Sequence, residues 1–245
     1  MCIRDSYTKD LIQDQLYVGS YLLLSFLSFM PGVFLFFFKN VENVQEDSLK
    51  EGNIRNLKSI VLQPRFLQAI TAAAFAYAVM SFLMTATPLS MHVMENMSLK
   101  ETGLVLQFHV VAMFLPSLIT GNLIKKYGHS AIIYGGVLFF FITVLLSLFE
   151  QTYLNYMLSL IFLGLGWNFL FISGTSLVVL TYNKEEKFKV QGINDLIVFS
   201  TMALASLSAG ILLNSIGWKM MNIICIPFLI LIILISFVAD KKSVS

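Results

Sequence analysis

Charged residues are absent from seven long stretches of this 245-residue chain, and no other feature limits its possible folds so strongly. The charge-free runs are 15–38, 66–94, 102–124, 127–149, 151–183, 196–218 and 220–239. Each contains at least 20 residues, the length that a helix needs to cross about 30 Å of hydrocarbon. Only 12% of the residues are charged and 57% are apolar, so polar side chains cannot cover a soluble globule of this size. The sequence therefore predicts an all-α membrane protein with seven transmembrane helices, and it argues against a disordered chain, a disulfide scaffold and a nucleic-acid binder.

Lysines and arginines concentrate in every second loop. Twelve fall in the segments 39–65, 125–126, 184–189 and 241–242, and four fall in the remaining loops and the N-terminus. Because cytoplasmic loops carry the excess of basic residues, this bias predicts a plasma (inner) membrane protein with a cytoplasmic C-terminus. Seven spans then place the N-terminus outside, although MCIRDSYTKD has no signal-peptide pattern. We expect the protein to begin earlier and its first residues here to be non-native. The alternative is a genuine seven-span protein with an external N-terminus.

The spacing of the runs divides the chain into two blocks. We expect an external stub at 1–16, one transmembrane helix at 17–38, a cytoplasmic linker at 39–65 and a six-helix bundle with a short tail at 66–245. The linker is rich in both signs of charge, whereas most connections within the last block are short. Short connections between helices indicate antiparallel neighbours in one bundle.

The loop after the third run carries a recognisable pattern. It reads Gly121-Asn122-Leu123-Ile124-Lys125-Lys126-Tyr127-Gly128-His129. Both glycines, the leucine and one basic residue fit the G-x-L-x-D-R-x-G-R/K motif of the major facilitator superfamily. Lys125 stands where that motif has an acid, so no gating role is transferred to it.

In this loop and in its layout, the chain resembles the C-terminal portion of such a transporter, truncated before helix six. The segments LMTATPLSM, FHVVAMFLPSLITG, GLGWNFLFISGTS and VQGINDLIVFS are also similar to a bacterial subgroup of the family. The resemblance implies helices six to twelve of a secondary transporter that moves a small solute by alternating access. It also implies a missing N-terminal half that would supply part of the solute site.

His109 is the one histidine well inside a run, roughly 10 Å from its end at 1.5 Å per residue. A histidine at this depth suits a proton or substrate site in the pathway, since its charge changes near neutral pH. The alternative is a neutral histidine that hydrogen-bonds to a neighbouring helix.

Asn168 lies at the middle of its run and shares a helix face with Gly164, Phe171 and Thr175. Together with the neighbouring Trp167, this face predicts a substrate wall with aromatic rings, a few polar groups and a gap at the glycine. The alternative is that Asn168 joins two helices by hydrogen bonds.

Two further polar residues are candidates. Thr87 precedes Pro88, whose missing N–H predicts a kinked or loosened helix that could line the pathway; a static kink is the alternative. Asp195 is predicted at the cytoplasmic start of its helix, where the helix dipole favours a carboxylate, or alternatively in a cytoplasmic gate. With Gly121, Lys125, Lys126 and Gly128, Asp195 completes the predicted gating and loop-motif residues.

Other classes of membrane protein fit less well. An intramembrane enzyme would need motifs such as HExxH, HxxxxD or GxSG with a later histidine, and the sequence has none of them. A seven-span receptor matches in number of helices, but not in the long linker before a six-helix block. The two cysteines, Cys2 and Cys225, indicate neither a disulfide framework nor a metal site. We expect no cofactor, no catalytic residue and no nucleic-acid partner; the expected partners are a small solute, protons and the lipid bilayer.

Overall fold

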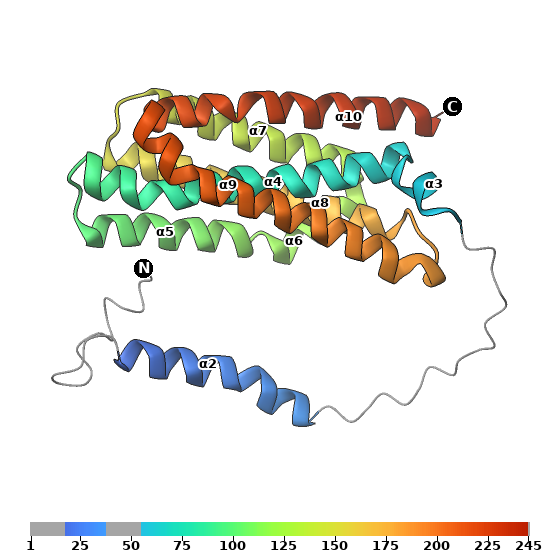
Figure 1. The fold of residues 1–245 in the computed structure, drawn as a ribbon, viewed down its shortest axis with the longest axis horizontal. Helices are drawn as coiled ribbons and strands as arrows, with labels where there is room; N and C mark the ends of the chain where they lie inside the picture. Colours follow the sequence, from blue (N-terminus) through green and yellow to red (C-terminus); the bar gives the residue numbers. More distant parts are fainter. Residues whose placement is uncertain (1–17, 38–54, 245) are drawn as a thin grey trace. The chain divides into compact units, whose positions relative to one another are not determined.

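The computed structural model describes residues 18–37 and 55–244, which belong to two separate units (Figure 1). All regular structure within these two ranges is helical, so the predicted fold class is confirmed for the described part of the chain. The stub predicted at 1–16 and the larger part of the linker predicted at 39–65 lie outside the described residues.

The smaller unit contains helix α2 (Val18–Phe37), close to the helix predicted at 17–38. Its side chains are exposed throughout the apolar stretch Tyr21–Leu35. An isolated helix that is apolar on all sides suits a lipid environment rather than water. Pro31 lies within this helix.

The larger unit is a bundle of antiparallel helices. Its elements are α3 (Leu57–Val61), α4 (Pro64–Pro88), η1 (Leu89–Met94), α5 (Leu99–Phe114), α6 (Ser117–Tyr127), α7 (His129–Leu148), α8 (Tyr153–Val179), η2 (Lys184–Glu186), α9 (Lys187–Ile224) and α10 (Ile226–Val244). Five segments of this unit are long and apolar enough to cross a membrane: Pro64–Met94, Leu99–Tyr127, His129–Leu148, Tyr153–Val179 and Lys184–Lys242.

The last of these segments, 59 residues long, reverses direction at Gly217. Gly217 has φ 74° and ψ 171°, a backbone conformation that side chains with a Cβ rarely adopt. The chain therefore turns back there, and α10 returns along the bundle (Figure 1). This turn divides the segment into two antiparallel helical parts (Figure 1).

Prolines interrupt two of the spans. Regular α-helix ends at Pro88, as the missing N–H predicts, and continues as the π-helical turn η1. The run 102–124, expected to be one helix, consists of α5 and α6 separated at Leu115 and Pro116. The ring of Pro116 clashes with the carbonyl four residues earlier and its missing N–H removes a helical hydrogen bond, so the helix is interrupted there.

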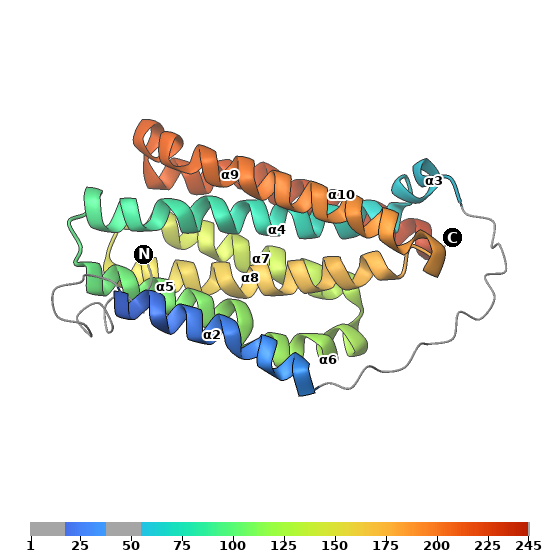
Figure 2. The same ribbon diagram turned by 60° about the horizontal axis from the view of Figure 1, so that its bottom comes forward.

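Helix α8 lies between α4, α5 and α7 and approaches each of them at a glycine (Figure 2). A Cβ on Gly164 would lie 2.7 Å from the backbone oxygen of His109 on α5, and one on Gly174 would lie 2.7 Å from that of Ala69 on α4. At Gly166 a Cβ would meet the ring of Phe140 on α7 at 2.4 Å, too close for any real contact. Close packing of this kind is how helices associate in lipid.

Most basic residues of the larger unit gather at one end of the bundle, here called the basic end; Lys100 and Lys219 lie at the other end. The basic end contains α3, the α6–α7 turn, η2 and the C-terminal residues of α10 (Figures 1 and 2).

Two charged clusters join helices at the basic end. Glu186 binds Arg55, with Arg55 Nη2 2.6 Å from Glu186 Oε2. Asp240 on α10 accepts hydrogen bonds from Arg65 at 2.9 Å and from Ser130 at 2.5 Å.

Candidate functional site

Five aromatic rings from four helices meet in the larger unit, in what we call the aromatic cluster. Its members are Tyr77 on α4, Phe114 on α5, Trp167 and Phe171 on α8, and Phe199 on α9. Trp167 and Phe171 are stacked, with centroids 4.9 Å apart and planes 12° apart. Tyr77 meets both of them edge-on, at 5.3 and 5.0 Å. Offset stacked and edge-to-face pairs are the favourable arrangements of such rings.

The aromatic cluster extends from the core to the surface of the bundle. Trp167 is 4% exposed, whereas Phe199 and Phe114 are 51% and 60% exposed. The ring of Phe199 lies 6.0 Å from Tyr77 and that of Phe114 lies 6.0 Å from Trp167. The cluster therefore offers a solute rings that already hold one another in place, with two of them open at the surface.

Sequence reasoning found Trp167 and Phe171 but missed Tyr77, Phe114 and Phe199. The missed rings lie on three other helices, so helical spacing along one segment cannot relate them to Trp167. Because the chain contains 22 phenylalanines, the residue type alone could not distinguish Phe114 and Phe199 from the others.

Asn168 uses its whole amide group in hydrogen bonds to the break between α5 and α6. Its Nδ2 donates to the Met113 oxygen at 2.6 Å and to Ser117 Oγ at 2.7 Å, and its Oδ1 accepts from Thr120 at 2.6 Å. The side chain is fully buried. In this conformation Asn168 joins two helices, and its amide has no atom left for a solute.

The gap predicted at Gly164 is absent, because the α5 backbone fills it. Gly164 and Asn168 therefore face α5, while Phe171 belongs to the aromatic cluster. Thr175, half-buried, donates to the oxygen of Phe171 on its own helix at 2.7 Å. The residues predicted to share one wall are thus separated: two pack against α5, Phe171 belongs to the aromatic cluster, and Thr175 bonds within its own helix.

His109 is fully buried between α5 and α8. Its Nδ1 lies 2.7 Å from the oxygen of Leu160, a geometry in which Nδ1–H donates to that carbonyl. Its Nε2 has no hydrogen-bond partner among the described residues. Ala112 and Met113, on the same side of α5 as His109, are also buried. This side of α5 packs against α8 instead of facing an open space.

Thr87 is fully buried, and its hydroxyl donates to the Leu83 oxygen at 2.8 Å. The loosened helix that follows Pro88 does not expose Thr87. On the next turn His92 Nδ1 lies 2.7 Å from the Met97 oxygen, at the end of the bundle opposite the basic end.

The loop-motif residues lie together at the basic end, on α6 and the turn after it. Lys125 and Lys126 occupy the last turn of α6, and Gly121 lies one turn earlier. Gly128, with φ 84°, ends α6 by donating its N–H to the Ile124 oxygen at 2.8 Å, and α7 begins directly after it. This glycine permits the tight reversal between two spans.

The position predicted for Asp195 within its helix is wrong. Helix α9 begins at Lys187, so Asp195 lies about two turns inside it. The helix dipole acts within the first turn, so it does not stabilise this carboxylate. Asp195 is exposed and accepts a hydrogen bond from its neighbour Asn194 at 3.1 Å.

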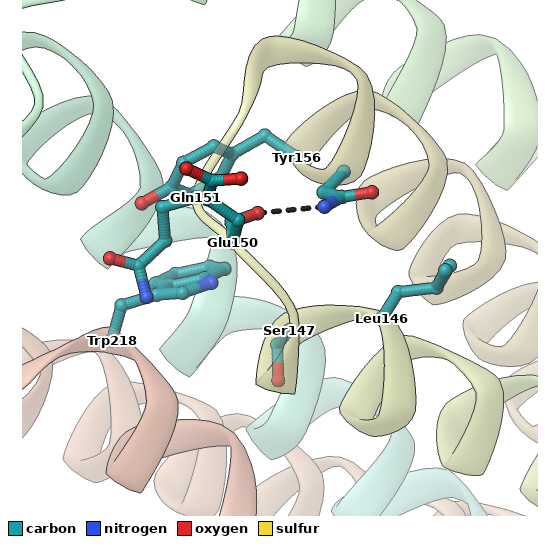
Figure 3. A pocket seen from close by; sticks show the side chains of 7 residues that line it. Leu146, Ser147, Glu150, Gln151, Tyr156 and Trp218 are labelled. Atoms are coloured by element: carbon teal, nitrogen blue, oxygen red, sulfur yellow. Dashed lines mark hydrogen bonds between the residues drawn. The ribbon is translucent and has the colours of Figure 1, made fainter.

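A small cleft lies at the opposite end of the bundle, where α7, α8 and the Gly217 turn meet. Figure 3 shows its lining residues, with Glu150, Gln151, Tyr156 and Trp218 around it. The Tyr156 hydroxyl hydrogen-bonds with Ser90 at 2.7 Å, and the Tyr156 and Trp218 rings are 5.2 Å apart. The cleft has no internal volume for a solute, so these contacts join α8, η1 and the turn rather than form a site.

Potential metal ligands are dispersed in the described part of the chain. Among these residues, no group of three histidine, cysteine or acidic side chains lies close enough to hold an ion.

Comparison with known sequences identifies the class of protein that this bundle represents. The sequence model described as Major Facilitator Superfamily matches residues 69–245. The chain belongs to the major facilitator superfamily.

Three curated proteins show the same relationship. The chain is 35% identical to a riboflavin transporter, RfnT, of Brucella anthropi over 93% of its own length and 57% of that protein. It is 26% identical to the uncharacterised transporter YdeG of Bacillus subtilis, over 84% of this chain and 50% of YdeG. A second Bacillus subtilis protein, YddS, is 30% identical over 60% of this chain and 34% of YddS. The chain spans about half the length of the first two relatives.

Proposed function

We propose that this chain forms helices six to twelve of a secondary transporter that carries a small solute by alternating access. The family membership and the transporter names of the relatives support transport. The chain spans about half the length of the first two relatives, which supports a first half that would pack against the face bearing the aromatic cluster. Rocking of the two halves would then expose the cluster to each side of the membrane in turn.

The aromatic cluster is the single observation that carries our proposal for the solute, a planar aromatic molecule of the riboflavin type. Four helices contribute the rings, and Phe114 and Phe199 are exposed for stacking. The described members of the cluster carry no charge, so they suit a neutral ring system. The riboflavin transporter of Brucella anthropi, 35% identical to this chain, independently supports a flavin.

Competition in a transport assay tests this proposal. Proteoliposomes that contain the longer protein carrying this chain would be given radiolabelled riboflavin, with excess lumichrome (the flavin ring alone) or ribitol (the side chain alone). We expect lumichrome to reduce riboflavin transport and ribitol to leave it unchanged. Inhibition by ribitol alone would contradict recognition through the ring, and absence of riboflavin transport would contradict the proposed solute.

We propose plasma-membrane placement with the basic end in the cytoplasm, on the strength of the basic residues gathered there. A C-terminal alkaline phosphatase fusion, active only outside the cytoplasm, would be inactive. An active fusion would place the C-terminus outside the cytoplasm and contradict the proposed orientation.

Proton coupling through His109 is a separate proposal, since a buried histidine whose Nε2 has no partner among the described residues has a free position for a proton. His109→Gln can still donate a hydrogen bond to Leu160 but cannot carry a proton between two solutions. We expect the variant to lose the pH dependence of transport. Unchanged pH dependence, with lower thermal stability, would assign His109 a structural role alone.

A further inference from the structure

An apolar groove of about 560 Å³ lies between α9 and α10, with α4 as its floor. Its lining includes Phe75, Val79 and Phe82 of α4, Thr201, Ala205, Ser208 and Leu212 of α9 before the Gly217 turn, Ile224 and Cys225 at the end of α9, and Phe228 of α10. The groove exists because α9 and α10, although consecutive, diverge after the turn at Gly217 while both pack on α4 (Figure 1). We propose that it holds one acyl chain of an anionic phospholipid from the leaflet at the opposite end of the bundle.

The groove is separate from the aromatic cluster. Thr201 and Ser208 lie about 160–180° around α9 from Phe199, and Ala205 lies about 120° from it, at 100° per residue. On α4, Phe75 and Phe82 line the groove, while Tyr77 joins the aromatic cluster. A solute on the cluster and a lipid in the groove would therefore occupy different sides of α4 and α9.

The walls of the groove suit hydrocarbon. Each of its three polar side chains is bonded to its own helix: Thr201 donates to the Ile197 oxygen at 2.9 Å, Ser208 to the Ala205 oxygen at 2.9 Å, and Cys225 to the Met221 oxygen at 3.4 Å. These bonds leave no strong donor of the walls directed at a ligand. An alkyl chain has no hydrogen bonds to lose when it enters such a space, whereas a polar solute would lose its hydrogen bonds to water.

The length of the groove matches one leaflet. From Thr201 to Leu212 the α9 wall covers 11 residue steps, about 16 Å at 1.5 Å per residue. Half of a hydrocarbon core of about 30 Å is about 15 Å. Phe75 and Phe228, with ring centroids 5.1 Å apart, meet at the groove in the middle region of α4.

A basic side chain near the Gly217 turn favours an anionic lipid. Lys219 is exposed two residues after Gly217, at the end of the bundle that the groove approaches through Ile224 and Cys225. In the part of the chain that the structure describes, Lys219 takes part in no ion pair. A lysine at the end of a span extends its ammonium group to the interface, where lipid phosphates lie.

Native mass spectrometry of the longer protein that carries this chain, with added phosphatidylglycerol, tests the proposal. We expect one lipid adduct that survives detergent removal in the wild type and is lost in Ala205→Trp, which fills the groove. Leu207→Trp is the matched control, since Leu207 is 76% exposed on the same helix and its variant should keep the adduct. Lys219→Gln should lose the preference for phosphatidylglycerol over phosphatidylcholine, while Lys100→Gln, at the same end, should keep it.

Equal adducts in the Ala205→Trp and Leu207→Trp proteins would overturn the proposal. If Ala205→Trp instead loses the mass of a dimer, the groove binds a second copy of the protein. If it loses a riboflavin adduct, the groove binds the solute. Either result also overturns the lipid proposal. A photolabelling experiment on the wild-type protein does not depend on whether the variants fold. Phosphatidylglycerol with a photoreactive acyl chain should label Val79 and Ala205 in preference to Leu207, and equal labelling would contradict a bound chain.

Discussion

Polar side chains inside the apolar helices are mostly bonded to the protein itself. Thr87 and Thr175 donate to carbonyls of their own helices, at 2.8 and 2.7 Å, and Asn168 bonds to the break between α5 and α6. This follows from the medium, because lipid offers no partner for a polar group. The sequence could identify these residues as unusual, but it could not show that Asn168 bonds to another helix, at the proline break between α5 and α6.

Replacement of Asn168 should therefore affect stability before it affects solute recognition. Asn168→Ala removes the side-chain partner of the Met113 oxygen and of Ser117, while the Thr120 hydroxyl keeps the Pro116 oxygen. The expected loss is about 1–3 kcal/mol. Thermal unfolding in detergent would measure it, with Asn122→Ala, an exposed amide on α6, as the control. A variant that unfolds at the wild-type temperature but no longer binds riboflavin would contradict this account and restore Asn168 to the solute site.

At the scale of helices, glycine positions decide how closely α8 approaches its neighbours. The charge-free runs predicted where each span lies, since charged side chains are costly in hydrocarbon. They could not predict the rotation of one helix against another. For this reason Gly164 was predicted as a gap in a wall, whereas the structure places the α5 backbone against it.

Gly174→Ala tests the close contact between α8 and α4. The new Cβ would lie 2.7 Å from the Ala69 oxygen and 2.9 Å from the Ala73 nitrogen; because both are backbone atoms, the helices must separate, at a cost of about 1–3 kcal/mol. Gly103→Ala on α5, with nothing within 4 Å of its Cβ, should instead be neutral or stabilise the protein by up to about 1 kcal/mol. Equal unfolding temperatures for the two variants would show that α8 does not depend on this contact.

The connection between α8 and α9 contains a pH-dependent contact, outside the apolar runs. Hydrogen bonds from the Arg55 side chain, and next from the Asn183 backbone N–H, lower the pKa of Glu186 to about 2. A carboxyl whose pKa is lower in the folded state stabilises the protein above its unfolded pKa, near 4.5, and this contribution is lost as the pH falls toward 2.

Glu186→Gln should accordingly lower the unfolding temperature at pH 7 and reduce its decline between pH 5 and pH 3. Glu185→Gln, the exposed neighbouring acid, is the control and should follow the wild type at both pH values. Parallel curves for the wild type and Glu186→Gln would show that the Arg55 contact adds no pH-dependent stability.

At the scale of the whole molecule, the sequence predicted the class of the fold and the family but only part of the candidate site. Apolar length and the grouping of basic residues are properties of single segments, and both agree with the bundle. The aromatic cluster is a property of four helices at once, so Trp167 and Phe171 were found and Tyr77, Phe114 and Phe199 were not. Two of its rings, Phe114 and Phe199, are exposed at the surface of the larger unit.

Riboflavin transport by single-ring variants tests the central claim, that the aromatic cluster binds the solute. Phe199→Leu and Phe171→Leu in the longer protein should each raise the riboflavin KM, by roughly five- to tenfold for the loss of about 1 kcal/mol or more of ring contact. Phe139→Leu is the matched control, because Phe139 belongs to a separate pair of ring contacts with Phe162 and Phe169 between α7 and α8. The account predicts a wild-type KM for Phe139→Leu alone, and equal KM values for all three variants would contradict it.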